Sequence, residues 1–344
     1  MNITIDKSIF DLYGTPDVDK NTFRKVLHAA EYRYHTISLS KTCDIDDISI
    51  IEDSNEAFFL QDLFFNSITY THEKRLSDCI IKVGGENEEV KKIFNINEAY
   101  EYIMSPAEII VENALNDGRF IRTIELHFDP DLEFEKYRSE NVIHIDNAGG
   151  SGDRSRVEDY LENHHWKQKF LHCFVIVDGD KRYPGDDRKI KQQEERLKLY
   201  RSLGVQYHVW EKRSMENYMP DEVFIAKRKQ FGVQWVDSYL HLLPQQRDFF
   251  CISGGFSKDI ESGQEKVKDN LPKDMKSYFN NVSATNFQRL LFSPNNRGGN
   301  FKDVFPKNFE DAANVRRDTL MARTSHQNDP DELLHISQMI RQII

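Results

Sequence analysis

The chain has 344 residues, a formal net charge of −11, 39% hydrophobic residues and 30% charged residues. This composition is typical of a water-soluble folded protein of one or two domains, and no segment approaches the roughly 20 apolar residues of a membrane span. Neither a signal peptide nor a C-x-x-C zinc motif is present, so we expect a cytoplasmic protein without membrane association.

The N-terminal third, residues 1–104, is acidic, with 11 Lys/Arg against 19 Asp/Glu. The apolar spacing from Phe58 to Phe65 predicts an amphipathic helix, and residues 79–83 predict a strand. We expect an α+β segment here. Its negative charge disfavours contact with nucleic acid, so docking of a partner protein is the role we consider.

From residue 106 onward, strand patterns alternate with helix patterns. Residues 108–111, 142–145, 170–177 and 205–210 predict four strands, with helices around Phe120 and over residues 154–169 and 189–203. This alternation predicts an α/β fold with a parallel four-stranded sheet flanked by helices. Beyond Pro220 the pattern is mostly helical. We therefore divide the chain into residues 1–104, 105–220 and 221–344.

Acidic side chains follow three of the four predicted strands. Glu112 follows the first, Asp178 and Asp180 follow the third, and Glu216 comes shortly after the fourth. Because parallel strands end at one edge of their sheet, we expect these carboxylates to converge. Like charges at short range repel unless a cation separates them. Oxygen ligands favour Mg²⁺ or Mn²⁺.

Structural alternatives exist for each acidic residue. The Asp178 sequence also suits an ordinary Asp-Gly turn. Glu112 alone suits an acid at a helix start, stabilised by the helix dipole. Glu216 suits an ion pair with Arg213 or Lys212, and its neighbours Asn217 and Tyr218 suit fixing the turn before Pro220.

The order of these motifs resembles a TOPRIM domain. The segments Val111-Glu112, Asp178-Gly179-Asp180 and Glu216-Asn217-Tyr218 are similar, more narrowly, to the OLD (overcoming lysogenization defect) TOPRIM nucleases of bacterial antiphage systems. The resemblance covers residues 106–220 and implies a Mg²⁺- or Mn²⁺-dependent nuclease. The residues that it implies for catalysis are Glu112, Asp178, Asp180, Glu216 and, as a late lysine near the scissile phosphate, Lys258. Glu112 has a general acid/base role as its alternative.

The sequence departs from the family pattern after Glu112. The family usually has a glycine next and a second acid four positions after the glutamate, where this chain has Asn113 and Asn116. Asp117 is one position further along and is our candidate for this second acid. The candidate metal ligands are then Glu112, Asp117, Asp178, Asp180 and Glu216.

A basic segment begins at the Asp178 turn. Residues 181–201 contain eight Lys/Arg against four Asp/Glu, which favours sequence-independent binding of a polyanion. The alternative for about half of these side chains is a solvated helix face with paired charges. The residues expected to contact nucleic acid are Lys181, Arg182, Arg188, Lys189, Lys191 and Arg213.

The predicted function is nuclease effector of an antiphage system. OLD-type enzymes couple cleavage to an ATPase, and neither glycine-rich stretch of this chain has P-loop spacing, so we expect a separate ATPase partner. DNA and RNA, tRNA included, are both open as targets, as is a homo-oligomer. The alternative is a catalytically degenerate TOPRIM-like module that acts as a binding or scaffold protein, which Asn113 and Asn116 favour. Strand passage or primer synthesis is a third reading.

Overall fold

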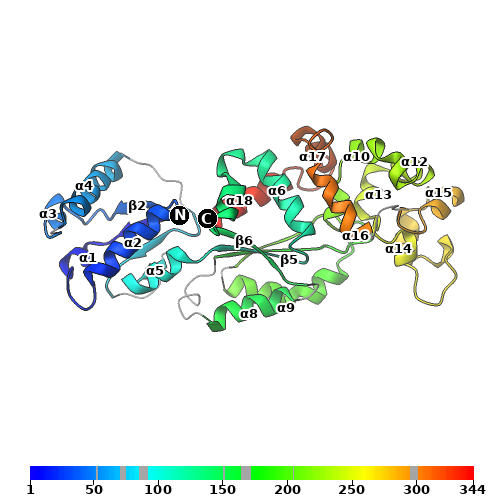
Figure 1. The fold of residues 1–344 in the computed structure, drawn as a ribbon. Coiled ribbons are helices and arrows are strands. Elements are labelled where there is room, and N and C mark those ends of the chain that lie inside the picture. The colour runs from blue at the N-terminus through cyan, green and yellow to red at the C-terminus, as the bar shows by residue number, and fades with distance from the viewer. Residues whose placement is uncertain are drawn as a thin grey trace.

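The computed structural model describes residues 1–51, 53–69, 75–84, 92–149, 152–163, 172–203, 205–294 and 301–344, except for the side chains of residues 66–69, 163, 189–190, 192–193 and 302–303. Within these ranges the chain forms two four-stranded, all-parallel sheets, placed one after the other along an elongated molecule (Figure 1). The α/β class predicted from the sequence is confirmed. None of the helices in these ranges has the length and apolar character of a membrane-spanning helix.

The first sheet belongs to the N-terminal third. Its strands are β1 (Asn2–Ile5), β2 (Thr36–Leu39), β3 (Cys79–Ile81) and β4 (Lys92–Phe94), in the order β2-β1-β3-β4. The helices are α1 (Lys7–Asp11), α2 (Lys20–Tyr32), α3 (Ile45–Ile48), α4 (Ser54–Thr69) and α5 (Ile96–Met104). α2 packs against α5, and α4 contacts β2. These elements enclose a hydrophobic core of their own, from Met1 to Ile103.

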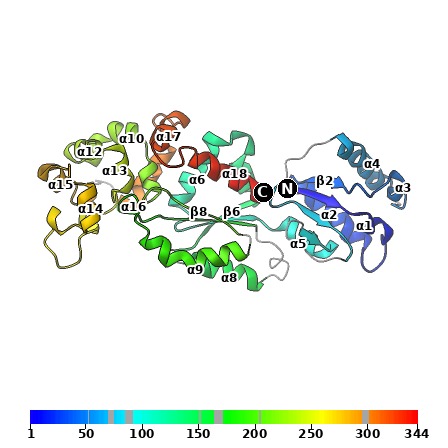
Figure 2. The same cartoon turned by 180° about the vertical axis from the view of Figure 1, so that it is seen from behind.

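The second sheet contains the four strands predicted after residue 106. They are β5 (Ala107–Val111), β6 (Ile143–Asn147), β7 (Cys173–Val177) and β8 (Gln206–Val209), in the order β6-β5-β7-β8. The connecting helices are α6 (Asn116–Phe128), α7 (Phe134–Ser139), α8 (Asp153–Asn163) and α9 (Arg188–Ser202). Residues 164–169 of the helix predicted over 154–169 lie outside the described ranges. Figure 2 shows α8 and α9 together on one face of this sheet.

Alternation along β7 explains how the sheet is covered on both faces, as its apolar sequence predicts. Phe174 and Ile176 belong to the core shared with α6, whereas Cys173 and Val175 pack with residues of α8 and α9. α6 comes close to β6 at Gly118, where a Cβ atom would lie 3.3 Å from the nearest side-chain carbon of the sheet.

The C-terminal part is mostly helical, as predicted, and shares the core of the second sheet. Its helices are α10 (Asp221–Ala226), α11 (Arg228–Phe231), α12 (Val233–Leu240), α13 (Pro244–Phe249), α14 (Lys273–Tyr278), α15 (Ala284–Arg289), α16 (Phe301–Val304), α17 (Arg317–Thr324) and α18 (Glu332–Ile343). α18 packs against both α6 and β7. The last helix therefore helps to cover the strand that leads to Asp178.

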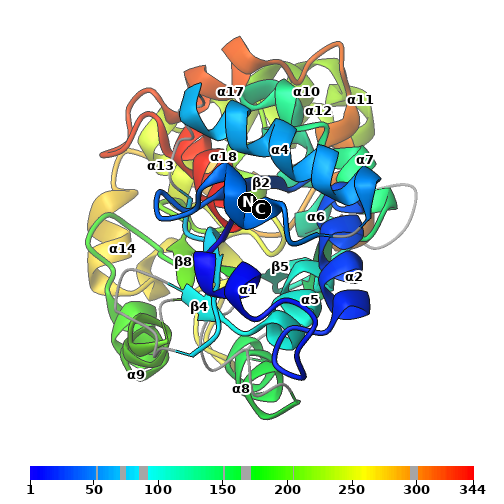
Figure 3. The same cartoon turned by 90° about the vertical axis from the view of Figure 1, so that its left-hand side faces the viewer.

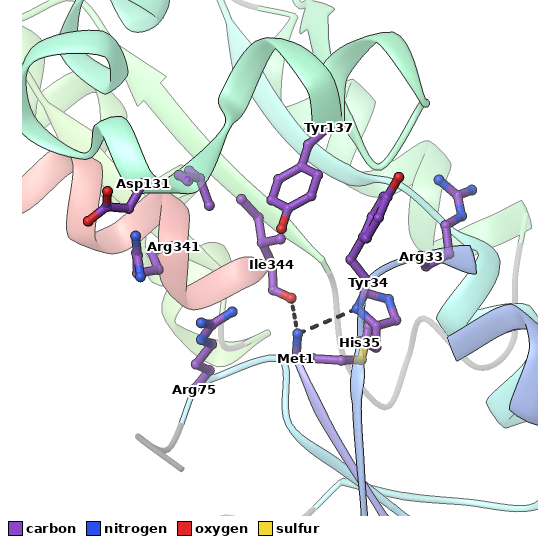
Figure 4. Close-up of a pocket in the computed structure, with 10 residues that line it drawn as sticks. Met1, Arg33, Tyr34, His35, Arg75, Asp131, Tyr137, Arg341 and Ile344 are labelled. Atoms are coloured by element: carbon purple, nitrogen blue, oxygen red, sulfur yellow. Dashed lines mark hydrogen bonds between the residues drawn. The ribbon is translucent and has the colours of Figure 1, made fainter. Parts of the chain in front are cut away.

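The first and last residues meet at the junction of the two sheets, as the view along the long axis shows (Figure 3). The Met1 amine donates to the carbonyl oxygen of Ile344. Arg33, buried at 5% exposure, donates to the carbonyl oxygen of Asn141 at 2.6 Å and so ties α2 to the second sheet. Beside these contacts lies a cavity of about 190 Å³ (Figure 4). Burial and the nearby Arg75 lower the pKa of the Met1 amine to about 5.

Candidate active site

Five carboxylates converge at the carboxyl edge of the second sheet. Asp178 directly follows β7 and is half-buried. Its pKa is raised well above the usual value, first by burial and then by the negative charges of Asp117, Glu216, Glu112 and Asp180. These groups come from three separate parts of the chain, and each lies near enough to Asp178 for its charge to raise the pKa of Asp178.

Glu112 and Asp117 are placed by the turn from β5 into α6. Asn113, and not Glu112, caps this helix: its side-chain oxygen accepts from the backbone N–H groups of Leu115 at 3.1 Å and Asn116 at 3.0 Å. The Asn113 N–H in turn donates to the Asp117 carboxylate at 2.8 Å. Burial, together with the charges of Glu216 and Glu112, raises the pKa of Asp117 to about 7.

The turn after β7 is tightly built. A Cβ atom on Gly179 would lie 2.6 Å from the carbonyl oxygens of Trp210 and Lys212, so only glycine allows this approach to the chain that follows β8. Asp180 takes a left-handed conformation, with φ of 47°, and its N–H donates to the Arg213 carbonyl oxygen at 2.8 Å. The turn therefore has a fixed geometry that an ordinary Asp-Gly turn does not need.

Glu216 lies on η3 (Met215–Tyr218), a short 3₁₀-helix that is held in place by hydrogen bonds of the next two residues, Asn217 and Tyr218. The Asn217 side chain is fully buried and donates to the carbonyl oxygens of Arg247 at 2.7 Å and Phe250 at 2.9 Å. Tyr218 donates to Glu332 of α18. Asn217 and Tyr218 thus fix this turn, as the sequence suggested, and the turn holds Glu216 near enough to Asp178 for its charge to raise the pKa of Asp178.

The two cations considered as partners for Glu216 bind other acids. Arg213 is buried and makes a two-pronged ion pair with Asp259, at 2.8 and 2.9 Å. Lys212 is completely buried and is paired with Asp248. Glu216 therefore makes no ion pair with either of them. The Arg213 guanidinium is therefore buried and paired with Asp259, so it is not exposed for the contact with nucleic acid that the sequence predicted.

The buried cluster around Asp248 was not foreseen in the sequence. Asp248 accepts from Lys212, from Arg323 at 3.0 Å and from His326 at 2.6 Å. Burial lowers the pKa of Lys212 to about 7, against the opposing charge of Asp248. Arg323 also donates to the Asn217 carbonyl oxygen at 2.7 Å, so α17 supports the turn that carries Glu216. No spacing in the sequence marks these residues, because Lys212 and the Arg323/His326 pair lie 36 or more positions from Asp248.

The carboxylates supply oxygen ligands only, which suits a hard divalent cation. In the described part of the chain, no three His, Cys, Asp or Glu side chains are already arranged around one point as metal ligands are. Neither Asp178 nor Glu216 has a cationic partner among the described residues. The fit is thus one of chemistry and proximity: the acidic oxygens are those a hard cation prefers, and the negative charges close to Asp178 raise its pKa.

The basic residues predicted to contact nucleic acid differ in their exposure and in the acids or carbonyl oxygens that they already bind. Lys181 donates to the Glu211 carbonyl oxygen at 3.3 Å, and Lys191 is exposed and paired with Asp187 at 2.7 Å. Arg188 is half-exposed and grips Asp186 with two hydrogen bonds of 2.7 Å.

Asp186 also holds the start of this basic segment. Burial alone would raise the pKa of Asp186, but hydrogen bonds from the Arg188 side chain and the Arg182 backbone lower this pKa to about 2. The Arg182 side chain is mostly buried beside Asp186. The side chain of Lys189 lies outside the described part of the structure.

Lys258 lies on η4 (Phe256–Lys258) and is exposed. It neighbours Asp259, the partner of Arg213, so the chain places it near the support of the Asp180 turn. Nothing in the described ranges links its ammonium group to the carboxylates.

Comparison with known proteins gives no further assignment, because no family model, curated protein or solved structure matches this chain.

Proposed function

We propose that the chain is a metal-dependent nuclease that cleaves phosphodiester bonds in DNA or RNA. One observation supports this most: Asp178 lies among four other carboxylates at the carboxyl edge of a parallel sheet, where α/β enzymes bind their ligands. Such an arrangement costs stability through repulsion, and a bound cation would relieve that cost.

Glu112, Asp178, Asp180 and Glu216 are the residues that would hold Mg²⁺ or Mn²⁺, with Asp117 as the candidate for a second ion. When bound, the ion supplies charge neutralisation at the phosphate, activation of water and stabilisation of the leaving oxygen. The protein's own part is to position these oxygens. Asn113 orients Asp117, and the Arg213 carbonyl oxygen fixes Asp180.

Exposed cations of the segment after Asp180 would bind the phosphate backbone. Lys191 and Arg188 keep much of their side chains in solvent, with 72% and 51% exposure. Their ion pairs with Asp187 and Asp186 are open to exchange for phosphate at the surface, which predicts binding that weakens with salt.

The resemblance to OLD-type nucleases supports a role as an antiphage effector that works with a separate ATPase. The sequence itself contains no P-loop motif, so energy-dependent control would come from another chain. A homo-oligomer is compatible with this role.

The test is cleavage of labelled single-stranded DNA, double-stranded DNA, RNA and tRNA with Mg²⁺ or Mn²⁺ and with EDTA. We expect Glu112→Ala and Asp178→Ala to abolish metal-dependent cleavage while the protein stays folded by circular dichroism. Lys82→Ala, at the edge of the first sheet, is the matched control and should cleave like the wild type. Undiminished cleavage by either acid variant would contradict the proposal.

A degenerate binding module is the second candidate, favoured by the absence of a ready-made ligand set among the described side chains. Calorimetric titration with Mg²⁺ or Mn²⁺ separates the two. A nuclease should bind the ion, and Asp178→Asn should weaken that binding. A degenerate module should bind none at millimolar concentration.

A further inference from the structure

Helix α4 in the N-terminal third exposes large aromatic side chains. Phe58 is 73% exposed, Phe65 57% and Phe59 37%, and Ile50 just before the helix is 47% exposed. Isolated apolar residues on a surface are ordinary, but neighbouring exposed phenylalanines on one helix are typical of a protein interface. We call these four residues the α4 face.

The spacing along α4 shows that the exposure is systematic. Leu60 is fully buried, and Leu63 and Phe64 pack against the core of the first sheet, so the helix already has an inward apolar side. Phe58 and Phe65 are seven positions apart and therefore lie on one outward stripe, with the exposed Asp62 between them. The second apolar stripe serves no purpose in the fold of the described residues.

A groove runs beside this stripe, between α4 and α2. Its volume is about 250 Å³, with Phe59 and Leu27 as apolar walls and Glu31, Asp53 and Glu56 among its polar lining. Arg24 is bound there by Asp53 at 3.3 Å and by Glu56. Glu31 is exposed at the edge of this groove. The lining of the groove thus combines apolar and acidic side chains.

The segment that carries the α4 face is acidic. Residues 42–69 contain seven Asp/Glu and no Lys or Arg. Lys7, paired with Asp47 at 2.8 Å, and Arg24, paired with Asp53 and Glu56, bring positive charge to this segment. Figures 1 and 2 show α3 and α4 at the end of the molecule away from the second sheet, where a partner has access.

We propose that the α4 face and its groove bind a basic amphipathic helix of a partner protein. The apolar side of such a helix would cover Phe58 and Phe65 and insert a side chain beside Phe59, while its Lys and Arg residues would face Glu31 and the acids of residues 42–69. An acidic surface repels anionic lipid, so the same charge argues against a membrane as the occupant. This inference is independent of the proposed nuclease activity.

The test uses a fluorescein-labelled synthetic peptide of about 18 residues, or roughly five helical turns, with leucines on one face and lysines elsewhere. Fluorescence anisotropy measures its binding to the full chain. We expect saturable binding that weakens with salt and is lost when the lysines are replaced by glutamates. A scrambled peptide whose leucines share no face should bind at least about tenfold more weakly.

Variants locate the site. Phe58→Ser with Phe65→Ser should weaken binding at least about tenfold and Glu31→Lys several-fold, because the first removes the apolar anchors and the second reverses the charge of the groove. Phe292→Ser is the matched control, since Phe292 is 60% exposed in the C-terminal part. It should bind the peptide like the wild type. All variants should keep the wild-type circular dichroism and the same metal-dependent cleavage.

Several results would overturn the inference. They are equal binding by the Phe58/Phe65 double variant and the wild type, equal binding of the scrambled peptide, and no binding at all. Sedimentation gives one more: a wild-type dimer that the double variant loses would place a second copy on the α4 face instead of a basic helix.

Discussion

The two sheets of this molecule have the same topology and very different edges. In both, the first strand along the chain lies between the second and the third, and the fourth is at the outside. After the strands of the first sheet, polar groups serve helix starts: Asp6 accepts from Ser8 at 3.1 Å, and Asn95 accepts from Glu98 at 3.0 Å. In the second sheet Asn113 takes over capping, and the carboxylates gather around Asp178 instead.

The comparison teaches that topology provides the edge and local sequence decides its use. The residue after β3 is Lys82, whereas the residue after β7 is Asp178. Lys82 puts a basic residue directly after the third strand of the first sheet, whereas the third strand of the second sheet leads into Asp178, whose pKa is raised by four nearby carboxylates. Accumulated repulsion of this kind is typical of functional sites, which sacrifice stability for binding.

The largest expected effect comes from neutralising the acidic edge. Asp178→Asn should lower metal-dependent cleavage at least about a hundredfold, because it removes a central ligand. The same change should raise the melting temperature in EDTA at neutral pH. The pKa of Asp178 is raised in the folded state, so its carboxylate lowers stability once pH exceeds the ordinary aspartate value.

Lys82→Asn is the corresponding change at the first edge and should leave cleavage as it is. A loss of stability in Asp178→Asn, or a loss of cleavage in Lys82→Asn, would break the distinction between the two edges.

Much of this arrangement was predictable from sequence, and the limits have physical reasons. Apolar runs in the sequence predict strands β5 to β8, and parallel topology then places Glu112 and Asp178 at one edge of the sheet. In the N-terminal third the sequence predicted β3, but β4 has only three residues and β1 and β2 only four each, too short for a clear strand pattern. The partners of Arg213 and Lys212 depend on which of many acids the C-terminal helices bring beside them, and no local pattern encodes that choice.

The second expected effect concerns the support of the acidic edge. Arg213→Ala should lower the free energy of unfolding by about 3 kcal/mol, because Asp259 would remain buried without its cation. Chemical denaturation measures this. Asp259→Asn combined with Arg213→Ala should recover part of the loss, since no buried charge then remains. A double variant as unstable as the single one would show that the ion pair is not the cause.

A third prediction uses a buried acid of α6, the helix that packs against α18. Glu125 of α6 is 1% exposed, and burial, together with the negative charge of Asp129, raises its pKa to about 8. Between pH 4.5 and about 8 the unfolded chain loses this proton and the folded chain keeps it, so stability falls as pH rises.

Glu125→Gln should therefore melt at a higher temperature than the wild type at pH 9, by an amount equivalent to about 2 kcal/mol, with little difference at pH 4. Thermal melts across this pH range provide the measurement. A constant difference at all pH values would mean that Glu125 is not the titrating group.

The smallest effect is expected on the exposed side of the acidic edge. Lys191→Ala should weaken binding of a labelled oligonucleotide only about two- to threefold, because one screened phosphate contact is lost. The slope of log affinity against log salt should fall by up to about one, and stability should not change, since both Lys191 and Asp187 are more than half exposed. The matched control is Lys25→Ala, an exposed lysine on α2 beside the first sheet. If Lys25→Ala weakened binding of the oligonucleotide as much as Lys191→Ala does, nucleic acid would contact both sheets. The functional contrast between the two sheet edges would then have to be abandoned.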